Sequence, residues 1–224
     1  EEEIAGQFPA AKVERLDFDT ARTRTAYERI ISDFEKGKTQ ILIGTQMLSK
    51  GLDFGNVSVV GILSADSLMN FPDFRAHERA YQLMVQVSGR AGRRDKRGTV
   101  ILQTTQPEHP LIRMVQHFAY KEMVSLQLSE RSMFRYPPYY RLIVLILRSR
   151  NEEALQEMSA LYAEKLRARL GDRVQTLHIK KIVLKIEISA GIAPLREILE
   201  GIHTEMQGYV PFKQLLVHYD VDPA

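Results

Sequence analysis

Short, largely apolar runs alternate with amphipathic helical segments in the first half of the chain, and this alternation limits the possible fold most strongly. The runs cover residues 41–43, 57–63 and 99–102, and each has the length of a strand. Residues 19–36 and 76–88 carry apolar side chains at helical spacing. Because apolar strands are typical of a parallel sheet buried on both faces, the pattern predicts a parallel α/β sheet with flanking helices.

Helix boundaries in this half follow from local signals. Asp19 or Thr20 is the expected N-cap of the first helix, and Gly37 is its expected stop. Residues 111–133 contain no Pro or Gly, which predicts one long helix.

Pro137 and Pro138 cannot continue that helix, so they predict a domain boundary. We expect residues 1–133 to form one domain and residues 134–224 a second. The second pattern predicts strands at 142–147, 182–188 and 214–219, and helices at 152–170 and from Pro194 onward, with Asn151 as a cap and Gly171 as a stop. This order is close to the β-α-β-β-α-β arrangement of ferredoxin-like domains.

Composition excludes several classes of protein. Hydrophobic residues make up 44% of the 224 residues and charged residues 26%, which excludes a disordered or low-complexity chain. The absence of cysteine excludes disulfides, Cys-ligated zinc and thiol catalysis within this chain. No apolar run approaches the ~20 residues of a membrane span. The net charge of +3 permits nucleic-acid binding without arguing for it, and the acidic start without Met indicates a fragment.

The most specific motif runs from Gln86 to Arg93, Gln-Val-Ser-Gly-Arg-Ala-Gly-Arg. On a continuous helix, Gln86, Arg90 and Arg93 would share one face. Two guanidinium groups and an amide on one edge suit a polyphosphate, because guanidinium groups form forked, charge-assisted bonds to its oxygens. Gly89 and Gly92 would let another surface come close. The alternative is a solvated, basic helix end.

A second motif covers residues 44–54, directly after an expected strand. Ligands of open α/β sheets gather at the carboxyl ends of strands. Thr45 could therefore donate its hydroxyl to a nucleic-acid phosphate, and Asp53 could accept from a ribose hydroxyl. The alternative is a loop with a capping Thr and a turn Asp.

The C-terminal half carries basic residues but no catalytic constellation. The basic residues are Lys165, Arg167, Arg169, Arg173, Lys180, Lys181 and Lys185, with Tyr139 and Tyr140 nearby. They could form a surface that follows a phosphate backbone, or a solvated helix face. The six histidines show no metal-ligand spacing, so we interpret them as structural and expect no metal site.

Together, the two motifs resemble motifs V and VI of superfamily 2 helicases, in the same order and on the expected elements. Residues 41–51, 73–79, 107–110 and 220–223 narrow the resemblance to the family of primosomal replication-restart helicases. Residues 16–20 also fit that family, so the resemblance covers essentially the whole chain. It implies a partial RecA-like helicase lobe followed by a small ferredoxin-like α+β domain.

The resemblance implies nucleotide-site roles for single residues. Arg93 would be the arginine finger that stabilises charge on the γ-phosphate of ATP, with Arg90 as its partner. Gln86 would be a coupling residue. Gly51 and Asp53 would line the nucleotide side of motif V together with both arginines.

The resemblance also implies DNA contacts by Thr45, Gln46 and Lys50. The full-length protein would be a cytoplasmic, ATP-dependent 3′→5′ DNA helicase that restarts stalled forks and initiates primosome assembly. It would use ATP and Mg²⁺, with zinc only in an upstream Cys-rich insertion. Its partners would be forked and single-stranded DNA, single-strand-binding protein and other primosome proteins, with no membrane, and it would be a monomer.

Parts of the family pattern are missing from the chain. It has no Gly-x-x-x-x-Gly-Lys-[Ser/Thr] loop and no acidic Mg²⁺-binding motif, and we expect it to begin inside the second lobe, after that lobe's first strand. We therefore predict negligible ATPase activity from this chain alone. The segment over residues 170–175 has fewer residues than the corresponding Gly- and Pro-bearing stretch of the family. Either a segment is deleted here or the printed chain omits one, and a strand of the second domain is undercounted.

Two other functions stay open. The chain could be a non-catalytic DNA-binding or scaffold module with a helicase-like lobe, which an upstream Walker loop in the parent gene would exclude. It could also be another superfamily 2 translocase, such as a branch-migration enzyme. Residues 220–223 and the pair Pro137 and Pro138 argue against that alternative.

Overall fold

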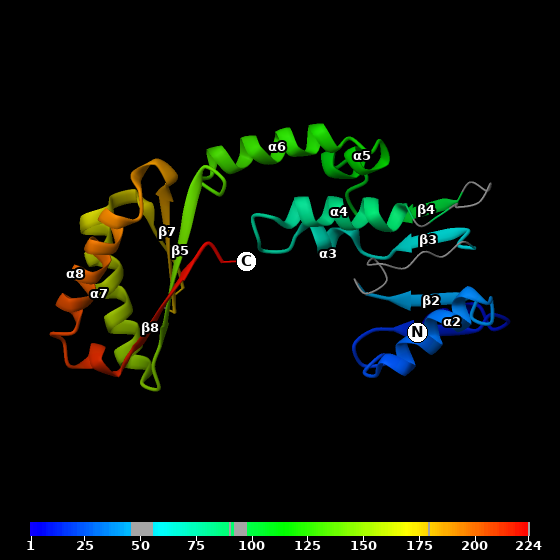
Figure 1. Ribbon diagram of the computed structural model, residues 1–224, viewed down its shortest axis with the longest axis horizontal. Coiled ribbons are helices and arrows are strands. Elements are labelled where there is room, and N and C mark those ends of the chain that lie inside the picture. Colours follow the sequence, from blue (N-terminus) through cyan, green and yellow to red (C-terminus); the bar gives the residue numbers. More distant parts are fainter. Residues whose placement is uncertain (46–55, 90, 92–97, 179, 224) are drawn as a thin grey trace. The chain divides into compact units, whose positions relative to one another are not determined.

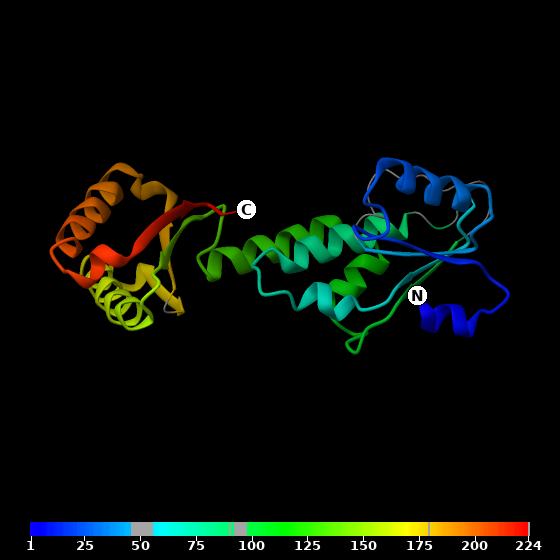
Figure 2. The ribbon, with the colours of Figure 1, turned by 90° about the horizontal axis from the view of Figure 1, so that it is seen from below.

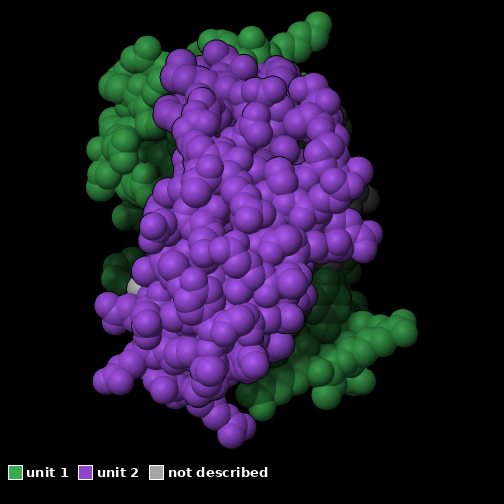
Figure 3. All heavy atoms as spheres, turned by 90° about the vertical axis from the view of Figure 1, so that its left-hand side faces the viewer, with its two compact units in different colours: residues 1–125 green, residues 126–224 purple. Residues whose placement is uncertain are grey.

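The computed structural model describes residues 1–45, 56–89, 91, 98–178 and 180–223 of the chain (Figure 1). The chain forms two compact units, Glu1–Ser125 and Leu126–Ala224, which Figure 3 shows in different colours. The division falls inside helix α6 (Tyr120–Met133), whereas the sequence places the domain boundary after residue 133.

Unit 1 alternates strands with helices. Its described elements are α1 (Glu2–Gln7), β1 (Val13–Leu16), α2 (Arg24–Glu35), β2 (Ile41–Gly44), β3 (Val59–Ile62), α3 (Ala65–Met69), α4 (Ala76–Ser88), β4 (Thr99–Leu102), α5 (Pro110–Gln116) and the start of α6. β1 pairs with β2 and β3 pairs with β4, both in parallel, and β2 and β3 point the same way in Figure 1. The predicted parallel α/β arrangement is confirmed, and its described ladders form two separate pairs.

Two apolar clusters stabilise unit 1. Leu16 of β1 and Ile30 of α2 are buried together, with Leu42 of β2 packed against them. The second cluster joins α3, α4, α5 and the start of α6, and includes the fully buried side chains of Met84 and Met123. β2 itself is only partly buried, so the expectation of a strand covered on both faces was wrong for residues 41–43.

The N-cap expected for the first helix was also wrong. Thr23 is the N-cap of α2, because its hydroxyl accepts a 3.2 Å hydrogen bond from the Ala26 amide. Asp17 and Thr20 form a separate turn, in which the Asp17 carboxylate accepts from the Thr20 amide. These polar groups are therefore used before the helix begins.

The single helix expected over residues 111–133 is divided into α5 and α6. Phe118 adopts a left-handed conformation, with φ of 52°. The Ala119 amide then donates to the Met114 carbonyl, which closes the end of α5 in the manner of a Schellman motif. A left-handed residue is usually Gly, and Phe gives no such signal in the sequence.

Unit 2 is a two-layer α+β domain. After the end of α6 it contains β5 (Tyr140–Arg148), α7 (Glu152–Leu170), η2 (Gly171–Arg173), β6 (Val174–His178), β7 (Lys181–Glu187), η3 (Ile188–Ala190), α8 (Ala193–Met206), η4 (Pro211–Gln214) and β8 (Leu216–Val221). The strands form an antiparallel sheet in the order β6-β7-β5-β8. α7 and α8 lie on the same side of this sheet (Figures 1 and 2). The predicted ferredoxin-like order is confirmed.

Local signals set the ends of α7 as the sequence predicts. The Asn151 side chain accepts a 3.1 Å hydrogen bond from the Ala154 amide, and Gly171 ends the helix with φ of 62°. β6 then follows directly after η2, so the strand that the sequence undercounted is present.

Ile188, expected in the next strand, lies in η3 and is 54% exposed. None of the described helices is both long and apolar enough to cross a membrane.

Candidate functional site

Thr45 directly follows the carboxyl end of β2 and is exposed to solvent. Its position follows from the parallel pairing of β1 and β2, in which Leu16 lies opposite Gly44. The carboxyl ends of parallel strands are where open α/β sheets bind ligands, so Thr45 lies at a place suited to one. The other residues predicted in this motif, Gln46, Lys50, Gly51 and Asp53, lie outside the described residues.

Gln86 lies in the last turn of α4 and is exposed. α4 ends at Ser88, with Gly89 as its C-cap. Arg90 and Arg93 lie outside the described residues. Of the predicted site residues, Thr45 and Gln86 are described, and they lie on separate elements of unit 1: Thr45 follows β2, and Gln86 is in α4.

Gly89 shows no close approach within the described part of the chain. An added Cβ would meet the carbonyl oxygens of Gln86 and Val85 at 3.6 Å, which is an ordinary contact. Its φ of −66° is also accessible to other residues. Any surface that requires a glycine here would have to come from outside these residues, and Gly92 lies outside the described range.

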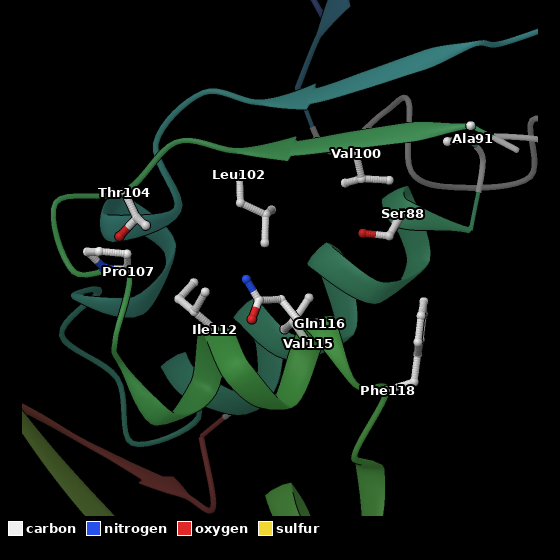
Figure 4. A pocket seen from close by; sticks show the side chains of 11 residues that line it. Ser88, Ala91, Val100, Leu102, Thr104, Pro107, Ile112, Val115, Gln116 and Phe118 are labelled. Carbon is white, nitrogen blue, oxygen red and sulfur yellow. The ribbon is translucent and has the colours of Figure 1, made fainter.

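A pocket of about 530 Å³ lies between the end of α4, β4 and α5 (Figure 4). The side chains of Leu102, Ile112 and Val115 face this space, and the amide of Gln116 lies beside them. Ser88 and Ala91, which flank Arg90 in sequence, also line it. None of the described lining residues is an acid or a base, so the pocket adjoins Ser88 and Ala91 without offering acid–base chemistry.

The loops that follow β3 and β4 are joined by Asp66, a residue that the sequence analysis did not single out. The Asp66 carboxylate accepts hydrogen bonds from the Thr104 hydroxyl, the Thr105 amide and the Thr105 hydroxyl. The Thr104 hydrogen bond, followed by the Thr105 amide, lowers the pKa of Asp66. An Asp in the first turn after a strand was the available signal, but its partners are 38 and 39 residues away.

The basic residues of unit 2 do not form one free surface. Lys165 and Arg169 both pair with Glu205, at 2.5 and 3.2 Å. Arg167 donates to the Thr176 hydroxyl. Lys185 is only 6% exposed, so it cannot contact a nucleic-acid backbone. The predicted basic surface is therefore wrong as a single patch that includes Lys185.

Several of the histidines have structural contacts. His109 accepts a hydrogen bond from the Leu111 amide at the start of α5, and His203 lies 3.4 Å from the Tyr219 hydroxyl. Within the described ranges, no group of three or more His, Asp or Glu side chains could hold a metal ion.

Comparisons with known proteins identify the class of unit 1. Residues 4–95 match the family described as Helicase conserved C-terminal domain. This part of unit 1 is therefore similar to helicase C-terminal domains. A solved structure, the C-terminal domain of the DEAD-box protein Dbp5, has a TM-score of 0.40 to this chain at 19% identity, covering 58% of this chain and 75% of that one.

Relatives narrow the class further. Over its whole length the chain is 37% identical to replication restart protein PriA of Bacillus subtilis (strain 168), of which it covers 29%. It is 42% identical to PriA of Synechocystis over 70% of its own length and 19% of the relative, and 38% identical to PriA of Treponema pallidum over 73% and 24%. The chain matches the C-terminal part of replication restart protein PriA, and it spans less than a third of the length of these relatives.

Proposed function

We propose that the chain is the C-terminal part of an ATP-dependent 3′→5′ DNA helicase that restarts stalled replication forks and initiates primosome assembly. The observation that carries this proposal is the match to PriA over the whole chain, together with the helicase C-terminal domain at residues 4–95. In this proposal the chain contributes motifs V and VI, while the phosphate-binding loop belongs to another part of the parent protein.

ATP and Mg²⁺ are the proposed cofactors of the full-length protein, and zinc would belong to an upstream insertion. ATP would supply a γ-phosphoryl group, and the transfer of that group to water would drive movement along DNA. Arg93 and Arg90 are proposed to stabilise charge on that group, with Gly51 and Asp53 at the same site. Gln86, at the end of α4, is proposed to couple this site to the rest of unit 1.

Thr45, Gln46 and Lys50 are proposed to contact the DNA backbone. The exposed position of Thr45 after β2 supports its part in this, because hydroxyl groups at such strand ends can donate to phosphate oxygens. Forked and single-stranded DNA, single-strand-binding protein and other primosome proteins are the proposed partners. The protein is proposed to act as a monomer in the cytoplasm.

The test is ATPase activity of the full-length parent with forked DNA, compared with its Arg93→Ala variant. We expect Arg93→Ala to lower DNA-stimulated turnover by about 10³-fold or more while nucleotide binding is largely kept. Arg24→Ala is the matched control, because Arg24 is an exposed residue of α2 that pairs only with Glu28 in the described contacts. This chain alone should show negligible turnover.

Two results would overturn parts of the proposal. Unchanged turnover in Arg93→Ala would show that motif VI here is a structural helix end. A full-length parent without DNA-stimulated ATPase activity would favour a non-catalytic DNA-binding or scaffold module. A Thr45→Val variant tests the DNA contact separately, because it removes the hydroxyl and keeps the side-chain shape; we expect weaker DNA binding.

A further inference from the structure

Lys185 is buried in the C-terminal sheet, where a lysine is rarely found. It lies in β7 between Leu184 and Ile186, which belong to the apolar core of unit 2. Its side chain is 6% exposed. Lysine is almost never fully buried without a partner, so the contacts of its ammonium group matter.

Both described partners of Lys185 lie in the segment that leaves α6. The ammonium group donates a 2.7 Å hydrogen bond to the Phe134 carbonyl. It also lies 3.8 Å from the centroid of the Tyr136 ring, a cation–π distance. Phe134 is the first residue after α6, so the ammonium group satisfies a carbonyl left over at a helix end. A cation at a helix C-terminus also interacts favourably with the helix dipole.

A second contact holds the same segment on a different element. The Arg135 guanidinium pairs with the Asp172 carboxylate of η2 at 2.6 Å. Arg135 adopts the left-handed conformation, with φ of 57°. Such a conformation in a non-glycine residue persists only where surrounding contacts impose it. Residues 134–136 are therefore held on unit 2 from both β7 and η2.

The burial of Lys185 is not explained by a gain in the unfolding free energy of unit 2. Removal from water lowers the pKa of Lys185, since it disfavours the charged form, and the nearby Arg135 adds to this. Replacing a buried charge by an apolar side chain of similar shape is often neutral or stabilising. The role of the buried ammonium group is therefore to fix the position of the chain at Phe134. An apolar side chain could not do this, because it cannot donate a hydrogen bond to the Phe134 carbonyl.

We propose that Lys185 is a conformational lock that holds the C-terminal end of α6 and residues 134–136 on the C-terminal sheet. Within unit 2, the second half of α6 and the antiparallel sheet then form one body, and the chain at Pro137 and Pro138 is not a free hinge. This goes beyond the proposed helicase function and does not depend on it.

The test is amide hydrogen exchange in the 224-residue chain and its Lys185→Met variant. The reporters are the amides of Phe134 and Tyr136, which donate to the Glu130 and Arg131 carbonyls. We expect both to exchange about tenfold faster in Lys185→Met, while core amides of β7 and the free energy of unfolding of unit 2 stay equal or rise. Lys181→Met, an exposed change in the same strand, should leave the reporters unaltered.

Unchanged exchange of the Phe134 and Tyr136 amides in Lys185→Met would overturn the proposal. Equally faster exchange over the whole sheet would also overturn it, because Lys185 would then support the domain in general. If Lys185→Met does not fold, Tyr136→Leu decides the question, since it removes the stacking ring and leaves the lysine in place. Faster exchange at Phe134 alone, without change in β7, would then support the lock, and unchanged exchange would overturn it.

Discussion

The Asp66 carboxylate accepts a 2.5 Å hydrogen bond from the Thr104 hydroxyl, across 38 residues of sequence. Asp66 lies in the first turn of α3, just after β3, and Thr104 follows β4. The Ala65 amide also donates to the Gln103 carbonyl, which extends the pairing of the two strands into their loops. One carboxylate thus fixes two neighbouring loops at the carboxyl edge of unit 1.

This contact predicts a pH-dependent effect of Asp66→Ala. The pKa of Asp66 is lowered below its ordinary value of 3.8, so the folded state binds fewer protons than the unfolded state. The contribution of the carboxylate is therefore complete above that pH and is lost as the pH falls through the lower, folded-state pKa. Unfolding measured between pH 7 and pH 2 should show Asp66→Ala less stable at neutral pH and the difference shrinking in acid.

Asp19→Ala is the control for this experiment, because Asp19 makes an exposed ion pair with Arg22 and no long-range contact is described for it. Its effect at neutral pH should be small. A difference between Asp66→Ala and the unchanged protein that persists undiminished in acid would contradict the assigned role of the charge.

Tyr162, which is buried, and Tyr219, which is partly buried, should behave as a coupled pair. The Tyr162 hydroxyl, in a side chain with 0% exposure, bonds to the Tyr219 hydroxyl, which also lies 3.4 Å from His203. Tyr219→Phe leaves the Tyr162 hydroxyl buried without this partner, so we expect a loss of about 1–3 kcal/mol in unfolding free energy. Tyr162→Phe should cost less, because Tyr219 keeps His203. The double variant should cost less than the sum of the two, and additive losses would show that the hydroxyls are not coupled.

Leu145 tests where the core of unit 2 lies. It is fully buried in β5, and Leu145→Ala should lower the unfolding free energy of unit 2 by about 2–5 kcal/mol through lost contacts and a cavity. Leu216→Ala in β8 is the matched control, since that side chain is 65% exposed; we expect a change within about 0.5 kcal/mol. Hydrogen exchange of the β5 amides measures the loss of stability in both variants. Equal losses in Leu145→Ala and Leu216→Ala would show that the core does not lie around Leu145.

Asn151 tests the cap of α7. Asn151→Ala removes the side-chain acceptor of the Ala154 amide and should cost about 1 kcal/mol. The Ala154 amide should exchange faster in this variant, whereas Asn151→Ser should largely restore both values because serine is also a good cap. A serine variant as unstable as the alanine one would argue that the cap is not the source of the effect.

Elements with strong local signals are predicted from the sequence to the residue. α4 and β4 have the expected bounds, and α7 begins after its asparagine and ends at its glycine. In each case the apolar periodicity and the flanking residues indicate the same element, and tertiary contacts favour that element too. The β-α-β-β-α-β order of elements in the C-terminal domain was also predicted from the sequence, although β6 was not among the strands identified there.

Other features depend on contacts between distant residues and give no local signal. The left-handed Phe118 divides α5 from α6, although nothing in residues 111–133 indicates a break. Asp19 and Thr20 look like a cap, but Thr20 is drawn into the turn with Asp17. Of the candidate site, the sequence placed Thr45 after its strand and Gln86 on its helix. It did not reveal Asp66, whose partners come from another loop.

The order of the C-terminal sheet has a consequence for synthesis of the protein. β5 lies in the interior of the sheet, yet one of its neighbours, β8, is translated after the other three strands of this sheet. The Leu142 amide donates to the Asp222 carboxylate, 80 residues later. Until the ribosome has released β8, one edge of β5 has no partner strand. An unpaired, apolar edge is a template for pairing with other chains, so the nascent domain is exposed to misassembly until β8 is available.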